Sequence, residues 1–139
     1  MQIDTSSEFG QRVERRLRED TVAWIVTVGT DGTPEPSPIW FLWDGTSFLI
    51  YSKPAAPKLR NIRRDSSIAL HLDGDGQGGD IVILTGRAEI LEQAPGVADV
   101  PAYVEKYARD IKEIGLTPES MAREYSTAIR VTPQKLRGH

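Results

Sequence analysis

Short segments rich in β-branched and aromatic residues alternate with tight turns in the first half of the chain, and this pattern limits the possible folds most strongly. Such segments favour strands over helices. The segments are residues 22–28 (VAWIVTV), 37–43 (SPIWFLW) and 47–52 (SFLIYS). The links between them are GTDGT and a region around Asp44-Gly45, both typical of turns. Strands joined this closely run antiparallel, so the sequence predicts an antiparallel sheet.

Three more strands are predicted downstream, at residues 67–72 (SIALHL), 81–91 (IVILTGRAEIL) and 127–131 (TAIRV). Gly86 would allow the bend that a barrel strand needs. Pro36 and Pro38 cannot donate to a ladder, so the strand that follows them should begin at a sheet edge or a bulge. Six strands in a chain of 139 residues predict a mainly β, small antiparallel barrel forming a single domain over residues 1–139.

Helical spacing occurs outside these strands. Apolar residues recur at helical intervals after Ser6-Ser7 and again between Val100 and Ile111. Short helices are predicted at residues 57–64, where Pro57 suits the first position, and at residues 117–123. The glycine loop, residues 73–80 (DGDGQGGD), should be an exposed connection.

The strand at residues 37–43 is apolar on both faces. Alternation places Ile39, Phe41 and Trp43 on one face and Pro38, Trp40 and Leu42 on the other. One face should line the barrel, and a second subunit is the simplest expected cover for the other. Either tryptophan of this strand could also line a substrate pocket.

Composition narrows the classes of function. The absence of Cys excludes disulfides, thiolate metal sites and cysteine nucleophiles. A net charge of -3 argues against a general nucleic-acid binder. The apolar runs are too short to span a membrane, and the N-terminus lacks the pattern of a signal peptide. We therefore expect a cytoplasmic protein that binds neither nucleic acid nor membrane.

The common catalytic patterns are missing. Neither His71 nor His139 belongs to an HExxH motif, and no GxSxG, Walker A or dinucleotide-binding fingerprint occurs. Asp73, Asp75 and Asp80 could bind a hard cation only weakly, so no metal site is predicted. An enzyme of this composition would depend on a bound organic cofactor for its chemistry.

A basic segment, residues 51–65 (YSKPAAPKLRNIRRD), contrasts with the acidic chain. It holds five cations and one acid. The start of its predicted helix offers free N–H groups and partial positive charge beside Ser52, Lys53 and Lys58, which suits a phosphate. The alternative is a solubilising basic helix.

The run from Trp24 to Leu70 resembles the pyridoxamine-phosphate-oxidase-like split-barrel flavoprotein superfamily. The resemblance rests on the DG turn, the proline-rich strand with its tryptophan, and KLRNIRRDS at residues 58–66. It covers about residues 8–91. The ending TAIRVTPQKLRG is similar to the closing strand of the branch that uses coenzyme F420, a 5-deazaflavin. The implied fold is a six-stranded antiparallel split β-barrel of the FMN-binding type.

This resemblance also implies a function and a site. It implies an F420-dependent oxidoreductase, with a homodimer that holds two cofactors at its interface and transfers a hydride between the deazaflavin and a small organic substrate. Relatives often carry a cation where this chain has Ala55-Ala56. Lys53 and Arg60 are its expected substitutes. The implied cofactor-binding residues are Ser52, Lys58 and Asn61 at the phosphate, Lys53 and Pro57 on its approach, the backbone of Pro36, Ser37, Pro38 and Ile39 beside the ring, and Gly79, Asp80 and Ile81 at the interface.

Several alternatives stay open. F420 carries a phosphodiester and several carboxylates, which would engage more of the cations than the single phosphate of FMN does. An FMN-dependent enzyme of the same fold is the first alternative. A carrier of the deazaflavin or a tetrapyrrole-like ligand is the second, and an RNA-binding barrel is the third. The expected reaction is reduction of an activated double bond or quinone-like acceptor. No proton donor is predicted, although water, Tyr51 and Ser37 are candidates.

Overall fold

The computed structural model describes residues 1–139 and contains seven strands, four α-helices and one short 3-10 helix. In chain order the elements are α1 (Glu8–Glu19), β1 (Ala23–Val28), β2 (Pro34–Ile39), β3 (Leu42–Trp43), β4 (Phe48–Ser52), α2 (Pro57–Arg64), β5 (Ser67–His71), β6 (Val82–Leu91), η1 (Val97–Asp99), α3 (Pro101–Glu113), α4 (Pro118–Glu124) and β7 (Thr127–Gly138).

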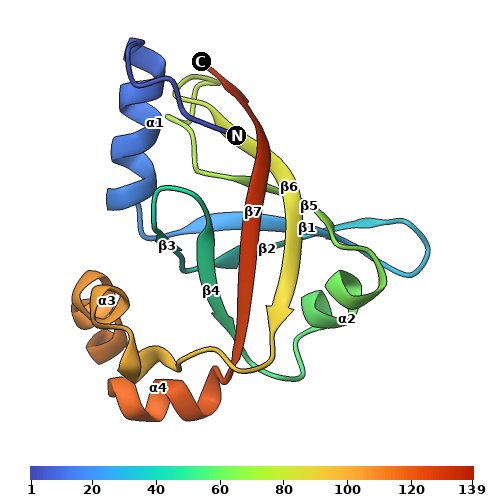
Figure 1. The fold of residues 1–139 in the computed structure, drawn as a ribbon, viewed down its shortest axis with the longest axis vertical. Coiled ribbons are helices and arrows are strands. Elements are labelled where there is room, and N and C mark those ends of the chain that lie inside the picture. The colour runs from blue at the N-terminus through green and yellow to red at the C-terminus, as the bar shows by residue number, and fades with distance from the viewer.

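The strands form one antiparallel sheet in the order β2-β1-β5-β6-β7-β4-β3. The sheet curls strongly, so that β1 and β2 cross behind β6 and β7 (Figure 1). The two edge strands, β2 and β3, do not pair with each other. This arrangement confirms the predicted split barrel with flanking helices.

The predicted strand at residues 37–43 is divided, so the count is seven strands rather than six. β2 ends at Ile39 and pairs with β1, whereas β3 begins at Leu42 and pairs with β4 at the opposite edge. The chain leaves one edge and joins the other across Trp40 and Phe41. Local composition does not reveal this change of partner, because both halves are equally apolar.

The last strand is longer than predicted, since β7 continues to Gly138 instead of ending at Val131. Pro133 does not interrupt it because Pro133 pairs with Gly86, next to a register shift between Thr85 and Gly86. A proline is tolerated where a bulge removes the need for its missing donor. A Cβ at Gly86 would collide with the backbone oxygen of Thr132, which explains the glycine at this predicted bend.

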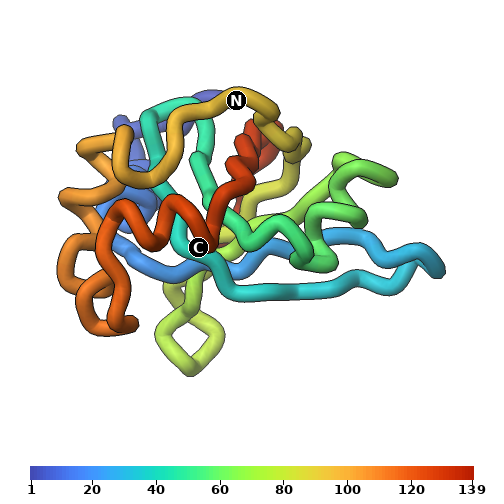
Figure 2. The backbone as a smooth tube through the Cα atoms, turned by 90° about the horizontal axis from the view of Figure 1, so that it is seen from below, coloured from blue at the N-terminus to red at the C-terminus, as the bar shows by residue number.

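Two apolar clusters hold the molecule together. The larger lies inside the barrel, where Val13 and Leu17 of α1 and Leu59 and Ile62 of α2 pack against inward-facing strand residues. The smaller lies between the sheet and α3 and α4. The helices α3 and α4 gather at one side, while the β1–β2 hairpin extends from the other (Figure 2).

The alternating faces predicted around the divided strand are confirmed. Phe41 and Trp43 are buried in the larger cluster, while Trp40 packs against the smaller one. Trp40 is covered in part by the same chain, and the expected cover by a second subunit stays a prediction. Tyr107 of α3 stacks on its ring, with centroids 4.7 Å apart and planes 5° apart. None of the helices combines the length and the apolar character needed to cross a membrane.

Candidate functional site

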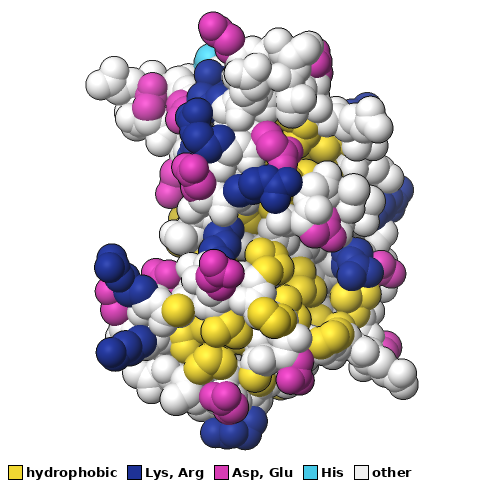
Figure 3. Space-filling view, turned by 60° about the vertical axis from the view of Figure 1, so that its left-hand side comes forward, with side chains coloured by type: hydrophobic (Ala, Val, Ile, Leu, Met, Phe, Trp, Pro, Cys, Tyr) yellow, Lys and Arg dark blue, Asp and Glu magenta, His cyan; other side chains and the backbone are white.

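A pocket of about 380 Å³ lies where the edge strand β2, the end of β4 and the start of α2 meet the helices α3 and α4. This volume is typical of small-molecule sites. Hydrophobic side chains gather on the lower half of the face in Figure 3, around the helical part of the molecule. The pocket lining is Val22, Pro38, Ile39, Trp40, Tyr51, Ser52, Lys53, Ala56, Lys58, Tyr103, Ile114, Met121 and Tyr125.

Lys58 gives the pocket a cationic corner. The side chain is half-buried and has neither a hydrogen bond nor an ion pair. Burial lowers the pKa of its ammonium group. Lys58 is the second residue of α2, whose preceding residue Ala56 offers no side-chain cap. An anion placed here would meet an unpaired ammonium and the positive end of a helix.

A second hollow, of about 220 Å³, adjoins the first and shares Ala56 and Lys58 with it. Ser37 and Pro57 belong to its lining. The Ser37 hydroxyl is buried without a hydrogen-bond partner, and so is the hydroxyl of Tyr103 in the larger pocket. Unsatisfied buried hydroxyl groups are uncommon in folded proteins and carry a cost, and these two remain able to bond a molecule bound beside them.

The lining suits a flat organic molecule that carries an anionic group. Its walls are apolar and aromatic, and its charged side chains, Lys53 and Lys58, are both cations. No carboxylate lines the larger pocket, whereas Glu35 lines the second hollow and accepts from Asn61 at 2.7 Å. The lining also lacks His and Cys, so the reaction would depend on the bound organic group rather than on a protein nucleophile.

Comparison with known proteins assigns the chain to a family. A family model described as pyridoxamine 5'-phosphate oxidase matches residues 9–139. The chain belongs to the pyridoxamine 5'-phosphate oxidase family. The comparison with curated proteins found no match.

Solved structures of the same fold have varied descriptions. One is a conserved hypothetical protein from Mycobacterium tuberculosis, 24% identical over 94% of this chain and 82% of its own, with a TM-score of 0.72. Another is an F420 reductase, 23% identical over 89% and 94% of the two chains, with a TM-score of 0.68. A third is the heme storage protein HutZ from Vibrio cholerae, 14% identical over 99% and 95%, with a TM-score of 0.64. At these identities the likenesses show the shared fold.

The fold brings together most of the residues predicted to hold a cofactor. The predicted residues that line one or both hollows are Pro36, Ser37, Pro38, Ile39, Ser52, Lys53, Pro57 and Lys58. They come from three separate elements, so their meeting is a property of the fold. Lys53 is exposed, and its ammonium lies 5.5 Å from the centre of the Tyr125 ring. Arg60 lines neither hollow and is exposed on the outer side of α2.

Asn61 lines neither hollow, and its side chain is hydrogen-bonded within the protein to residues that line the second hollow. Its amide donates to the Thr27 hydroxyl at 3.0 Å and to the Glu35 carboxylate at 2.7 Å, and its oxygen accepts from Arg64 at 2.8 Å. The predicted contact of Asn61 with a phosphate therefore does not fit. Asn61 instead fixes α2 against β1 and β2, which positions Lys58.

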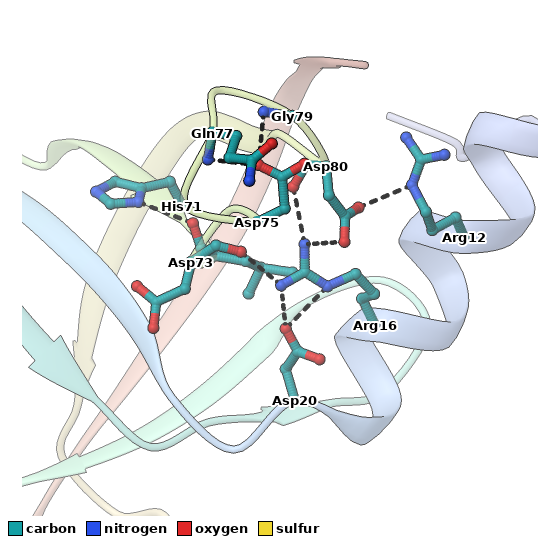
Figure 4. A network of polar contacts seen from close by, with 10 residues as sticks. Arg12, Arg16, Asp20, His71, Asp73, Asp75, Gln77, Gly79 and Asp80 are labelled. Atoms are coloured by element: carbon teal, nitrogen blue, oxygen red, sulfur yellow. Dashed lines mark hydrogen bonds and ion pairs between the residues drawn. The ribbon is translucent and has the colours of Figure 1, made fainter.

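The residues predicted to meet a cofactor from the glycine loop, Gly79, Asp80 and Ile81, line neither hollow of the same chain. Figure 4 shows Asp80 facing Arg12 and Arg16 of α1. The Arg12–Asp80 pair is 2.9 Å long, and Arg16 also donates to the Asp80 carbonyl at 2.9 Å. One chain alone therefore cannot bring this loop to its own pocket in the described conformation.

The acids of the glycine loop also have partners. Asp73 accepts from Trp24 Nε1 at 3.0 Å, and Asp75 accepts from the backbone of Gln77 at 2.7 Å and of Gly79 at 2.9 Å. No group of three His, Cys, Asp or Glu side chains is arranged to hold a metal ion. Asp75 therefore holds the conformation of the loop, whereas Asp73 and Asp80 attach the loop to β1 and α1.

The two side-chain candidates for proton donation differ. The Tyr51 hydroxyl donates to the Pro95 carbonyl at 2.8 Å, and burial, followed by the nearby Asp99 charge, raises the pKa of Tyr51 to about 12. Ser37 keeps an unpaired hydroxyl. Trp40 lines the pocket as anticipated, whereas Trp43 is buried and donates to Glu14 at 3.2 Å.

Sequence reasoning missed the wall that α3 and α4 contribute. Its members include Tyr103, Met121 and Tyr125. Their spacing indicated helices but not the direction in which the helices pack. One signal was available, because three of the chain's four tyrosines line the pocket, and tyrosine combines an apolar body with a polar tip.

Proposed function

We propose that the pocket binds the deazaflavin coenzyme F420 and that the protein transfers a hydride between the deazaflavin and a small organic substrate. The observation that carries the proposal is Lys58, a half-buried cation without a partner in the lining of an apolar, aromatic pocket. An unpaired ammonium is costly to bury, and an anionic ligand would offset that cost.

The residues present fit such a cofactor. Lys58, Ser52 and the uncapped start of α2 would bind its phosphodiester. The edge strand at Ser37 and Pro38 would lie beside the ring, where the unpaired Ser37 hydroxyl could contact a polar ring atom. When bound, F420 supplies the hydride chemistry. The chain binds and orients it and keeps water away from the apolar wall.

Surplus cations support F420 over FMN. Lys53 in the pocket lining and Arg60 on α2 are exposed, and neither has a carboxylate within ion-pair distance. A chain of carboxylates on the cofactor would engage them, whereas FMN ends at one phosphate. FMN remains the alternative. The substrate would be an activated double bond or a quinone-like acceptor.

We also propose a homodimer. The outward face of β1, β5 and β6 carries the half-buried residues Trp24, Val26, Ala69, His71 and Ile83, and no helix of the same chain covers them. A second copy would bury this apolar face. Such an arrangement would also let the glycine loop of one subunit approach the pocket of the other.

Titration of the purified protein with F420, and separately with FMN, tests the proposal. We expect F420 to bind at micromolar concentration or tighter and FMN to bind more weakly, followed by cofactor fluorescence. Lys58→Met should weaken F420 binding about tenfold or more, because one charge-assisted contact is lost. Arg63→Met is the matched control, since Arg63 lies on the same helix but outside the pocket lining.

Each other outcome has a definite meaning. Tighter binding of FMN would keep the site and replace the cofactor. Equal losses in Lys58→Met and Arg63→Met would show attraction to a basic helix rather than a built site. Tight F420 binding without cofactor oxidation across enones and quinones would favour a carrier, and hemin as a third titrant would test the tetrapyrrole alternative.

A further inference from the structure

The chain's four tyrosines lie at or beside the pocket, and their hydroxyl groups differ in the hydrogen bonds that they make. Tyr51, Tyr103 and Tyr125 line the pocket, and Tyr107 packs beside Tyr103 with ring centroids 4.9 Å apart. The Tyr51 hydroxyl is held by the carbonyl of Pro95 at 2.8 Å. The Tyr51 hydroxyl is thus already hydrogen-bonded within the protein.

The Tyr107 hydroxyl makes more hydrogen bonds than the Tyr51 hydroxyl does. Its hydroxyl donates to the Thr21 carbonyl at 2.8 Å and accepts from the Phe41 backbone N–H at 2.8 Å. These contacts tie α3 to the segment between β2 and β3. Tyr107 therefore has a structural role that its hydroxyl explains.

Tyr103 is the exception. Its side chain has no exposed surface, it lines the pocket, and its hydroxyl has no hydrogen-bond partner. Burial, together with the neighbouring Tyr107, Tyr51 and Tyr125 side chains, raises the pKa of Tyr103 well above its usual value. The hydroxyl therefore stays protonated and can donate at any physiological pH.

We propose that the Tyr103 hydroxyl donates a hydrogen bond to a carbonyl-type oxygen of the substrate and so positions it in the pocket. The inference rests on the proposed function, because it assumes that the cofactor's anionic group occupies the Lys58 corner. The remaining space has apolar walls that include Val22, Trp40 and Met121. These walls and one neutral donor select an uncharged cyclic or aromatic carbonyl compound.

Tyr125 forms another part of the wall of this pocket. Tyr125 lines the same pocket, is half-buried and makes no side-chain hydrogen bond, so its ring can turn without breaking one. Its contact with Lys53 is a cation–π contact at 5.5 Å, which contributes little at an exposed site. Of the three tyrosines in the lining, Tyr125 is thus the one that is neither fully buried nor hydrogen-bonded.

The first test is the stability of Tyr103→Phe, measured by urea unfolding of the ligand-free protein. Removing an unpaired buried hydroxyl should leave the unfolding midpoint unchanged or raise it. Tyr107→Phe is the matched control and should lower the midpoint, since it leaves the Phe41 N–H and the Thr21 carbonyl without their partner. A comparable loss in both variants would show that Tyr103 is bonded within the protein and would overturn the inference.

The second test uses two probes that differ in one oxygen, 1-tetralone and tetralin, with Trp40 fluorescence as the readout in a Trp24→Phe, Trp43→Phe background. The parent protein should bind 1-tetralone about three- to tenfold more tightly than tetralin, as expected for one hydrogen bond. Tyr103→Phe should abolish this preference and leave the tetralin affinity unchanged. A preference that survives in Tyr103→Phe, or failure of both probes to bind the parent, would overturn the inference.

F420 titration separates this inference from the function on which it rests. Tyr103→Phe should bind F420 as the parent does, because Tyr103 is assigned to the substrate. A parent protein that does not bind F420 would refute the proposed function even if the 1-tetralone preference is present. Normal F420 binding by a protein that fails the probe test would refute only the role of Tyr103.

Discussion

The two ends of the molecule use their cations in opposite ways. At the glycine-loop end, all four ion pairs of the chain involve arginines of α1, namely Arg12, Arg16 and Arg18. At the pocket end, Lys53, Lys58 and Arg60 have no carboxylate within ion-pair distance. The first end satisfies its charges internally, and the second leaves them available.

This difference distinguishes a structural from a binding role. Arg16 has only 13% of its side chain exposed, and every contact it makes is to the protein. Lys58 is also half-buried, but it gains nothing from the folded chain that would offset its burial. A cation of the first kind should stabilise the fold, whereas one of the second kind is retained for a ligand.

The largest expected effect follows from breaking the paired end. Arg16 bonds the Asp20 carboxylate at 2.6 Å, the Asp80 carbonyl at 2.9 Å and the Asp73 carbonyl at 2.7 Å (Figure 4). Arg16→Met leaves all of these acceptors without their donor. We expect the free energy of unfolding to fall by about 2–3 kcal/mol, measured by urea denaturation.

Arg15→Met is the control for this change. Arg15 is exposed on the same helix and has no ion pair or side-chain hydrogen bond, so its replacement should change the free energy of unfolding by less than about 0.5 kcal/mol. If Arg16→Met were as harmless as Arg15→Met, the paired end would not be a stabilising structure and the comparison would lose one side.

The contacts at these two ends could be predicted from the sequence only in part. The strands, the bend at Gly86 and the basic segment follow from local composition and turn chemistry, and so they could be predicted. The partners of Arg16 are separated from it by up to 64 residues, and only the fold brings them together. The same holds for Asn61, whose side chain was expected at a phosphate but bonds Thr27 and Glu35.

The pocket itself was foreseen only on the side that its strands form. Ser52 and Lys58 lie within one predicted basic segment, so their closeness was visible in the sequence. Tyr103 and Tyr125 approach the pocket because α3 and α4 pack over β4 and β7, and helical spacing does not specify that direction. The unpaired state of Tyr103 depends on the positions of its neighbours in space, which no motif encodes.

A smaller effect should appear in the dependence of stability on pH. Lys106 of α3 donates to the Phe41 carbonyl at 2.9 Å and lies 3.9 Å from the centre of the Phe41 ring. Burial lowers the pKa of Lys106 to about 8, against a smaller opposing effect of Asp20. Between this value and 10.5 the unfolded chain holds a proton that the folded chain releases, so stability should rise with pH in that window.

The ionisation of tyrosines sets the pH at which this rise in stability ends. The folded protein keeps the Tyr51 proton up to about pH 12, whereas the unfolded chain loses it near 10, so stability should fall above pH 10. Urea unfolding at pH 8, 10 and 11 should therefore show a maximum near pH 10. Lys106→Met should flatten the rise between pH 8 and 10, and an equally steep rise in this variant would show that Lys106 keeps its ordinary pKa.

The smallest expected effect is that of Lys58→Met on the free energy of unfolding, and it contrasts most clearly with the effect of Arg16→Met. Lys58→Met removes a cation that burial disfavours and that has no partner, and it keeps an apolar chain of similar length against Ala56. The free energy of unfolding without ligand should therefore stay within about 0.5 kcal/mol of the parent value or increase. Its urea midpoint, measured beside Arg16→Met, decides the comparison, because a loss as large as that of Arg16→Met would mean that Lys58 stabilises the fold and is not held in reserve for an anion.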